Sequence, residues 1–119
     1  MVKKVLVAED ESSIRKTFQL ILQDEYQLDF ADGGVAAIQK AISNEYDLIL
    51  LDLKMPDFSG YEALKKIKAV KPAARIVVIT GFYQEYRELS DKIDPLVLGV
   101  IFKPVEIDEL KQKIKEFVS

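Results

Sequence analysis

Short runs of consecutive apolar residues recur along the chain, and they predict buried strands. Residues 5–8, 48–51 and 76–79 are runs of four, each bounded by charged or polar positions. Strands in a parallel sheet that is covered on both faces have this continuous apolar character, because neither face meets water. Residues 96–102 have the same character, and residues 28–31 predict a weaker strand at a sheet edge.

Between these runs, apolar residues recur at the three- or four-residue spacing of amphipathic helices. The stripes are Ile14, Phe18 and Ile21; Val35, Ile38 and Ile42; Leu64 and Ile67; Phe82, Tyr86, Leu89 and Ile93; and Ile107, Leu110, Ile114 and Phe117. Ser59 and Glu62 also have the spacing of a capping box at the start of the third helix. Strands and helices therefore alternate along the whole chain.

This alternation predicts an α/β fold with one parallel sheet and helices on both of its faces, since parallel neighbours need crossover connections. For five strands we expect the doubly wound order 2-1-3-4-5. The reversal of winding in that order opens a crevice at the carboxyl ends of strands 1 and 3. With 119 residues, 49% of them hydrophobic, we expect a single domain over residues 1–119.

The chain contains no histidine and no cysteine. Ser-His-Asp and Cys-His nucleophiles, and zinc sites built from His and Cys, are therefore excluded. Any chemistry at the crevice has to come from carboxylates, hydroxyls and amines.

Charge and hydropathy set expectations for location and partners. The chain has 17 Lys and Arg against 20 Asp and Glu, and its lysines are scattered, so we expect no direct contact with nucleic acid. The near-apolar run 96–102 has seven residues, whereas a membrane span needs roughly 18. The first residues also lack the pattern of a secretion signal. We therefore expect a cytoplasmic protein without membrane association.

Polar side chains follow the apolar runs, at the end of the sheet where ligands of such folds bind. Glu9 and Asp10 follow the first run, Asp52 follows the third, Thr80 the fourth and Lys103 the fifth. Taken alone, each could be an ordinary turn, helix-start or surface residue. Their common position at one edge of the predicted sheet indicates a shared site.

Glu9, Asp10 and Asp52 would repel one another strongly at a shared site unless a cation lies between them. An all-oxygen site open to water suits Mg²⁺, which takes one or two carboxylates directly and keeps several waters. We predict Asp10 and Asp52 as direct ligands and Glu9 as a ligand through water. With the metal and Lys103 drawing charge, Asp52 can attack phosphorus, giving an aspartyl phosphate held by Mg²⁺, Lys103 and the Thr80 hydroxyl.

Four motifs in the chain resemble those of the receiver domains of two-component response regulators. They are Val7–Glu11, Leu50–Gly60, Ile79–Gly81 and Phe102–Pro104. They occur in the order and spacing of that family and span nearly the whole chain. The second is the most specific, because its aspartate is followed by Met-Pro and then by glycine. The resemblance implies a flavodoxin-like fold and a phosphorylation-dependent signalling switch, similar to the single-domain chemotaxis receivers.

The resemblance also implies roles for individual residues. Asp52 would be the phosphoacceptor, and Glu9 and Asp10 would bind Mg²⁺ together with the backbone carbonyl of Lys54. Thr80 and Lys103 would act with Asp52 on the phosphoryl group, and the bond between Lys103 and Pro104 would be cis. Such a domain catalyses its own phosphorylation and dephosphorylation but is not a turnover enzyme.

The partners implied by the resemblance are proteins. A histidine kinase or phosphotransfer protein would donate the phosphoryl group, and its histidine has to belong to another chain, because this one has none. The face formed by the fourth helix, the fifth strand and the fifth helix would then change its preference for a downstream protein. We expect a monomer or a weak homodimer, and the sequence leaves open a stand-alone receiver or a part of a longer regulator.

Three features depart from the family pattern or modify it. Val100 occupies the position where relatives commonly carry Tyr or Phe, so Phe82, Tyr83 or Phe102 either reports the switch instead or is a packing residue. Residues 93–99 predict an unusual end to the fourth helix. Lys54 and Phe82 flank the path of attacking water, which motivates the hypothesis that the phosphorylated form hydrolyses slowly.

Three other functions are alternatives. A Mg²⁺-dependent phosphohydrolase would use the same aspartyl nucleophile, but Lys54 stands where its general acid would be. A flavin module needs a loop that surrounds a phosphate, which Glu9 and Asp10 would repel. A receiver-like module that binds a partner without phosphorylation would not need the complete set of site residues.

Overall fold

The computed structural model describes residues 2–119, and its strands form one parallel sheet. The strands are β1 (Lys3–Ala8), β2 (Tyr26–Ala31), β3 (Leu48–Asp52), β4 (Ile76–Thr80) and β5 (Gly99–Phe102). Their order is β2-β1-β3-β4-β5, and every neighbouring pair is parallel. The predicted α/β class and strand order are confirmed, and the winding reverses at β1 as expected.

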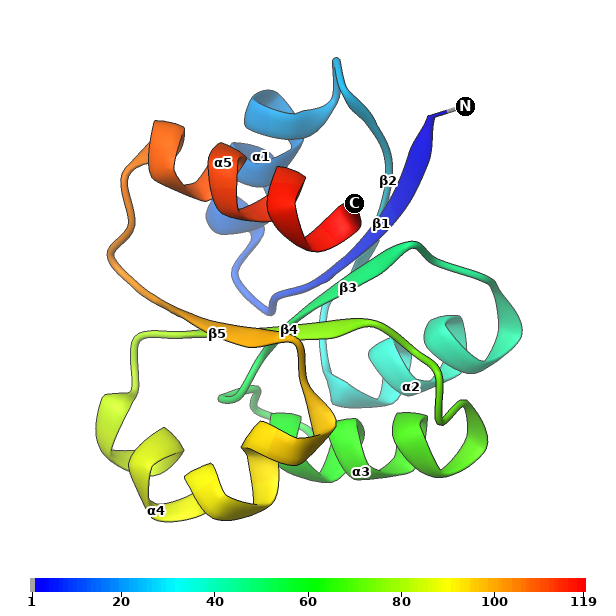
Figure 1. Cartoon of the computed structure of the whole chain (residues 1–119), viewed down its shortest axis with the longest axis vertical. Coiled ribbons are helices and arrows are strands. Elements are labelled where there is room, and N and C mark those ends of the chain that lie inside the picture. Colours follow the sequence, from blue (N-terminus) through cyan, green and yellow to red (C-terminus); the bar gives the residue numbers. More distant parts are fainter. Residues whose placement is uncertain (1) are drawn as a thin grey trace.

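Helices cover both faces of the sheet (Figure 1). They are α1 (Ser12–Leu22), α2 (Gly34–Ser43), α3 (Gly60–Val70), α4 (Tyr83–Ile93) and α5 (Ile107–Val118). Figure 1 shows α1 and α5 together on one face and α2, α3 and α4 on the other. Within residues 2–119, no helix has both the length and the apolar character needed to cross a membrane.

Two apolar layers lie on either side of the sheet because successive strand residues point to opposite faces. Val5 and Val7 of β1 pack in the layer of α1 and α5, with Phe18 and Ile114. Leu6 packs in the layer of α2, α3 and α4. The apolar residues of β1, β3 and β4 are thus buried on both faces, which explains the continuous apolar runs. The polar residues that follow the runs gather at the carboxyl edge of the sheet.

The predicted helical stripe is correct for α3 and only partly correct for α2, where Ile38 packs against the core but Val35 is exposed. Leu64 of α3 is fully buried, as predicted. In α2 the buried positions are Gly34, Ala37 and Ala41, whereas Val35 is 46% exposed. The reason is close packing: a Cβ atom on Gly34 would lie 2.5 Å from Cβ of Phe58. Small residues therefore form the inner face of α2, and a search for large apolar side chains misplaces that face.

The segment before β5 is more irregular than the apolar run 96–102 predicts. A 3₁₀ helix, η1 (Asp94–Leu96), follows α4 directly, which confirms the expected unusual end of that helix. Pro95 has no N–H with which to continue the α-helical pattern. The Leu98 N–H already donates to Ile76 O at 2.8 Å, but β5 begins only at Gly99. The predicted strand was therefore too long at its start.

The predicted capping box at the start of α3 is wrong in its partners. Ser59 is the N-cap residue, and its Oγ accepts a hydrogen bond from the Tyr61 N–H at 3.2 Å, one residue before the expected donor. Glu62 instead forms an ion pair with Lys65 at 3.1 Å. Ser59 therefore still caps α3, but the Glu62 side chain pairs with Lys65 on the surface of the helix.

Candidate functional site

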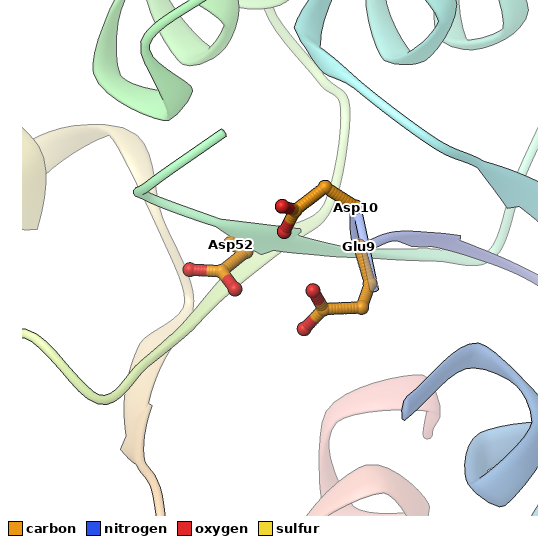
Figure 2. Close-up of side chains that lie close together, drawn as sticks. All are labelled: Glu9, Asp10 and Asp52. Carbon is orange, nitrogen blue, oxygen red and sulfur yellow. The ribbon is translucent and has the colours of Figure 1, made fainter. Parts of the chain in front are cut away.

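Three carboxylates meet where β1 and β3 end. The two strands are paired with Ala8 opposite Leu51, so the residues that follow them are neighbours. Oxygen atoms of Glu9, Asp10 and Asp52 all lie within 4.8 Å of one another. Figure 2 shows the three side chains converging on one point from the two strand ends. The carboxylates predicted from the sequence are therefore brought together.

Two of these carboxylates are buried, and one lysine forms an ion pair with each of them. Glu9 is 2% exposed and Asp52 is 3% exposed. Lys103 Nζ lies 2.8 Å from Glu9 Oε1 and 2.9 Å from Asp52 Oδ2. Burial alone would lower the pKa of Lys103, but its hydrogen bonds to Glu9 and Asp52 outweigh this and raise the pKa. Lys103 therefore stays charged at neutral pH.

Asp10 has a different environment from the other two acids. Burial raises the pKa of Asp10, and the neighbouring Glu9 side chain raises it further. The direct contacts of Lys103 go to Glu9 and Asp52. The direct lysine contacts of the site therefore go to two of its three carboxylates, and the charge balance at Asp10 favours the arrival of another cation.

Backbone N–H groups fix the orientation of the two buried carboxylates. The Lys54 N–H donates to Asp52 Oδ1 at 3.2 Å, and the Glu11 N–H donates to Glu9 Oε2 at 3.1 Å. Each carboxylate is thus held through both oxygens, one by Lys103 and one by the backbone. The Lys54 backbone, predicted as a metal ligand through its carbonyl, is thereby held beside Asp52.

Thr80 and Lys103 close the site from the ends of β4 and β5. Thr80 is fully buried, and its Oγ1 accepts a hydrogen bond from the Phe82 N–H at 3.0 Å. The Lys103 N–H donates to Thr80 O at 2.8 Å. The bond between Lys103 and Pro104 is cis. Thr80 thus lies at the predicted edge, with its hydroxyl turned to the backbone of the following loop.

Gly60 allows the loop after Asp52 to fold back on its strand. A Cβ atom at Gly60 would lie 2.2 Å from the Asp52 carbonyl oxygen, a distance that no side chain tolerates. The Gly60 N–H also donates to Leu53 O at 2.9 Å. The glycine in this motif is therefore required by a close backbone approach directly behind Asp52.

Asp57 ties the same loop to α2, a contact that the sequence did not indicate. Its Oδ1 accepts from the Gly34 N–H at 2.9 Å and its Oδ2 accepts from the Val35 N–H at 3.3 Å. The hydrogen bond from the Gly34 N–H contributes most to lowering the pKa of Asp57, and the bond from the Val35 N–H lowers it further. The N-terminus of α2 thus holds the loop that follows Asp52.

Arg15 is a second residue at the site that sequence reasoning missed. Its Nη1 donates to the carbonyl oxygens of Glu9 and Asp10, both at 2.8 Å. The position lies in the first turn of α1, five residues after Asp10, where a lone arginine gives no signal of its own. Its contacts go to the backbone, which a motif search for side-chain chemistry does not detect.

Lys54 and Phe82 lie together at the mouth of the site. Asp10, Asp52, Lys54, Phe82 and Lys103 line one cavity of about 310 Å³. Lys54 Nζ lies 4.2 Å from the centre of the Phe82 ring, within the range of a cation–π contact. Phe82 is 41% exposed, so the pair forms part of the rim of the cavity.

The position of the usual aromatic residue is taken by Val100, which packs against the layer of α2, α3 and α4. Phe102 lies on the outside, 41% exposed, with its ring centre 5.3 Å from that of Tyr83 and 5.4 Å from that of Tyr86. Phe102 therefore joins an aromatic cluster between β5 and α4.

The donor set of the site fits a hard divalent cation. Carboxylate oxygens are the ligands that Mg²⁺ prefers, and the site holds an excess of acidic groups over cationic ones. The cavity also opens to solvent beside Asp10 and Asp52, which leaves room for the waters that Mg²⁺ retains.

Comparison with known proteins places the chain beside bacterial signalling proteins. The family model described as response regulator receiver domain matches residues 5–115. Response regulator ArlR of Staphylococcus haemolyticus is 36% identical over 115 residues, which are 93% of this chain and 50% of ArlR. Sporulation initiation phosphotransferase F of Bacillus subtilis is 29% identical over 119 residues, which are 99% of this chain and 95% of that protein. The chain spans about half the length of ArlR and similar relatives.

Solved structures that resemble this chain also include response regulator receiver domains. Response regulator protein TrrA of Thermotoga maritima, in complex with Mg²⁺-BeF, is 37% identical with a TM-score of 0.86, covering 98% of this chain and 99% of TrrA. A CheY-like receiver domain protein of Methanospirillum hungatei is 28% identical with a TM-score of 0.89, covering 99% of this chain and 94% of that one. The predicted flavodoxin-like fold is confirmed.

Proposed function

Because the chain belongs to the response regulator receiver domain family, whose members are phosphorylation-dependent signalling switches and not turnover enzymes, we propose that Asp52 accepts the phosphoryl group. One observation carries this proposal above the others. Asp52 is a buried carboxylate that is held by Lys103 and faces two further acids across an open cavity. This is the arrangement that an aspartyl nucleophile for phosphorus requires.

Mg²⁺ is the proposed cofactor. Asp10 and Asp52 would hold it directly, Glu9 through water, and Lys54 through its backbone carbonyl. When bound, it would neutralise the charge that develops on the transferring phosphoryl oxygens. The excess of carboxylates over cations at the site supports this assignment.

The residues of this chain would then act as follows. An oxygen of Asp52 forms a bond to phosphorus while the donor's phosphorus–nitrogen bond breaks and its electron pair returns to the imidazole nitrogen. Lys103, which forms a hydrogen bond with Asp52 in the unphosphorylated chain, would pair with a phosphoryl oxygen. Thr80 would leave the Phe82 amide and donate its hydroxyl to the phosphoryl group. In this scheme the domain catalyses its own phosphorylation, and water later hydrolyses the product.

The proposed donor is a histidine kinase or a phosphotransfer protein. The names of the relatives support this, since they include response regulators and a sporulation phosphotransferase. The proposed output is altered binding of a downstream protein by the face of α4, β5 and α5, where the exposed rings of Tyr83 and Phe102 lie. A single domain over residues 1–119, a monomeric or weakly dimeric state, a cytoplasmic location and the lack of direct contact with nucleic acid remain predictions.

The proposal is tested with phosphoramidate, a small donor whose phosphorus–nitrogen bond resembles that of phosphohistidine. We expect the wild-type chain to gain the mass of one phosphoryl group in the presence of Mg²⁺ and none after chelation. The Asp52→Asn variant has no nucleophilic carboxylate at this position and should stay unmodified. If the wild-type protein also stays unmodified, the alternative of a receiver-like module that works without phosphorylation is the better account.

A further inference from the structure

Arg15 holds two consecutive carbonyl groups of the loop that carries the acidic pair. Its Nη1 lies 2.8 Å from Glu9 O and 2.8 Å from Asp10 O. Hydrogen bonds from a charged donor are about twice as strong as neutral ones, and the guanidinium stays charged at every accessible pH. The loop between β1 and α1 is therefore held by a permanent cation.

Besides this contact, the loop is held by one backbone bond to β2 and by the bonds of the Glu9 side chain to Lys103 Nζ and to the Glu11 N–H. The Glu9 N–H donates to Ala31 O at 2.9 Å, which fixes the start of the loop to β2. After that point the backbone turns into α1, whose N-cap residue Glu11 makes no side-chain capping bond. Repulsion among the three carboxylates opposes the position of the loop beside Asp52, and the direct contacts of Lys103 offset it only at Glu9 and Asp52. Arg15 acts against this displacement.

The two carbonyls that Arg15 contacts belong to the same residues whose side chains face Asp52 (Figure 2). The direction of a Cα–Cβ bond is set by the two peptide planes that meet at the Cα atom, and the Arg15 contacts with the Glu9 N–H bond to Ala31 O hold these planes at Glu9 and Asp10. Ligands of a metal bind best when outer contacts orient them before the ion arrives. The Arg15 contact therefore bears on the geometry of Glu9 and Asp10 together.

We infer that Arg15 is a positioning residue for the divalent-cation site. It holds the Glu9–Asp10 backbone so that both carboxylates point toward Asp52, and it thereby raises the affinity of the site for the cation. The inference rests on the proposed function for the identity of the site as a Mg²⁺ site. It adds a residue that contacts neither the ion nor the phosphoryl group.

A merely structural role for Arg15 makes a different prediction. If the arginine only braced the start of α1, its loss would lower the melting temperature and leave cation affinity unchanged. Arg75 provides a matched control, because its Nη2 donates to Phe117 O at 2.7 Å beyond the amino ends of the strands. Arg75→Gln therefore removes a similar arginine–carbonyl contact far from the acidic site.

The experiment is a titration with Mn²⁺ alone, in which electron paramagnetic resonance measures the free ion. We expect Arg15→Gln to bind Mn²⁺ about tenfold more weakly than wild type, the lower end of the effect of outer-shell partners. Arg15→Lys keeps a charged donor but lacks the rigid planar guanidinium that contacts both carbonyls, so it should bind Mn²⁺ more weakly than wild type and more tightly than Arg15→Gln. Arg75→Gln should bind as wild type does. Phosphorylation of Arg15→Gln should recover to the wild-type rate at saturating Mg²⁺.

Several results would overturn the inference. Wild-type affinity in Arg15→Gln would do so, as would an equal loss of affinity in Arg75→Gln. If Arg15→Gln does not fold, Arg15→Lys decides: a dissociation constant equal to that of wild type contradicts the inference, and a higher one supports it. A wild-type chain that binds no Mn²⁺ would overturn this inference and the proposed function together, whereas unchanged binding in the variants overturns this inference alone.

Discussion

The ammonium group of Lys54 lies 4.2 Å from the centre of the Phe82 ring, at the rim of the cavity that Asp52 lines. Lys54 belongs to the loop after β3, and Phe82 is the N-cap residue of α4. The contact therefore connects the two loops between which water would approach a phosphoryl group on Asp52. The pair gives a physical basis to the hypothesis that the phosphorylated form hydrolyses slowly.

Breaking this pair should shorten the lifetime of the phosphorylated form. An exposed cation–π contact contributes about 0.5–1 kcal/mol, so Lys54→Asn or Phe82→Ala should speed hydrolysis roughly twofold to fivefold. Loss of label from the purified phosphorylated chain measures the rate. Lys65→Asn is the control, because Lys65 Nζ lies 4.8 Å from the Tyr61 ring centre, outside the cavity. Unchanged or longer lifetimes in the first two variants would discard the hypothesis.

Lys103 should be needed for stability when no cation is bound. Replacing it by Met leaves Glu9 and Asp52 buried and close together without their counterion. Loss of one partner from a buried ion pair costs about 3 kcal/mol, which urea unfolding at neutral pH without metal would reveal. Added Mg²⁺ should restore part of this stability. Lys115→Met, at an exposed position of α5, should change little.

The pKa of Lys103 in the folded state sets the pH above which its ion pairs no longer stabilise the protein. Because the pKa is raised on folding, the stabilisation is fully present below the unfolded value of about 10.4 and is lost as pH rises through the folded value. The unfolding free energies of wild type and Lys103→Met should therefore converge only in strong alkali. Convergence already at neutral pH would contradict the role of the ion pair.

Asp29, in the edge strand β2, should make the stability of the fold depend on pH in the acidic range. Its Oδ2 accepts from the Tyr46 hydroxyl at 2.6 Å and its Oδ1 from Lys40 Nζ at 3.1 Å. Burial would raise the pKa of Asp29, but these bonds outweigh it and lower the pKa. Stability from Asp29 is therefore complete above its unfolded pKa of about 3.9 and is lost as pH falls through the lower folded value.

The test compares wild type with Asp29→Asn by thermal or urea unfolding across acidic pH. Because Lys40 is partly exposed, we expect the variant to be less stable at neutral pH by only about 1 kcal/mol. The difference should shrink as pH falls below about 4. Tyr46→Phe, which removes one of the two donors, should give an intermediate dependence on pH. A difference between Asp29→Asn and wild type that stays constant with pH would show that the carboxylate charge is irrelevant there.

Asp57 should control how tightly the loop after Asp52 is fastened to α2. Asp57→Ala removes the acceptor of the Gly34 and Val35 N–H groups, so hydrogen exchange at these two amides should accelerate. Asp57→Asn keeps one acceptor oxygen and should have a smaller effect. Equal exchange rates in wild type and Asp57→Ala would mean that water satisfies these amides equally well.

The sequence was sufficient to predict the sheet and the edge at which its site lies. Buried strands require continuous apolar runs, and residues such as Asp52 and Thr80 mark where those runs stop. The face of α2 was not predictable in this way, because its contact depends on small residues that allow close approach. Val35 therefore appeared to be a core residue, although it lies outside.

The contacts of Arg15 and Asp57 were also beyond the reach of sequence patterns. Both side chains bind backbone groups of loops whose paths are set by the fold, and no spacing rule records such pairs. The same holds for Phe102, whose position relative to Val100 could be predicted but whose aromatic neighbours on α4 could not. These contacts depend on how the loops and α4 are arranged in three dimensions.

The most direct test of the account is to locate the phosphoryl group on the chain. An aspartyl phosphate is reduced by borohydride to homoserine, so peptide mass spectrometry after treatment with phosphoramidate, Mg²⁺ and borohydride identifies the modified residue. If Asp52 is the phosphoacceptor, homoserine should appear at position 52 in the wild-type chain and should be absent when Mg²⁺ is chelated. Homoserine at Asp10 or at another acidic residue, or none at all with Mg²⁺ present, would contradict this assignment.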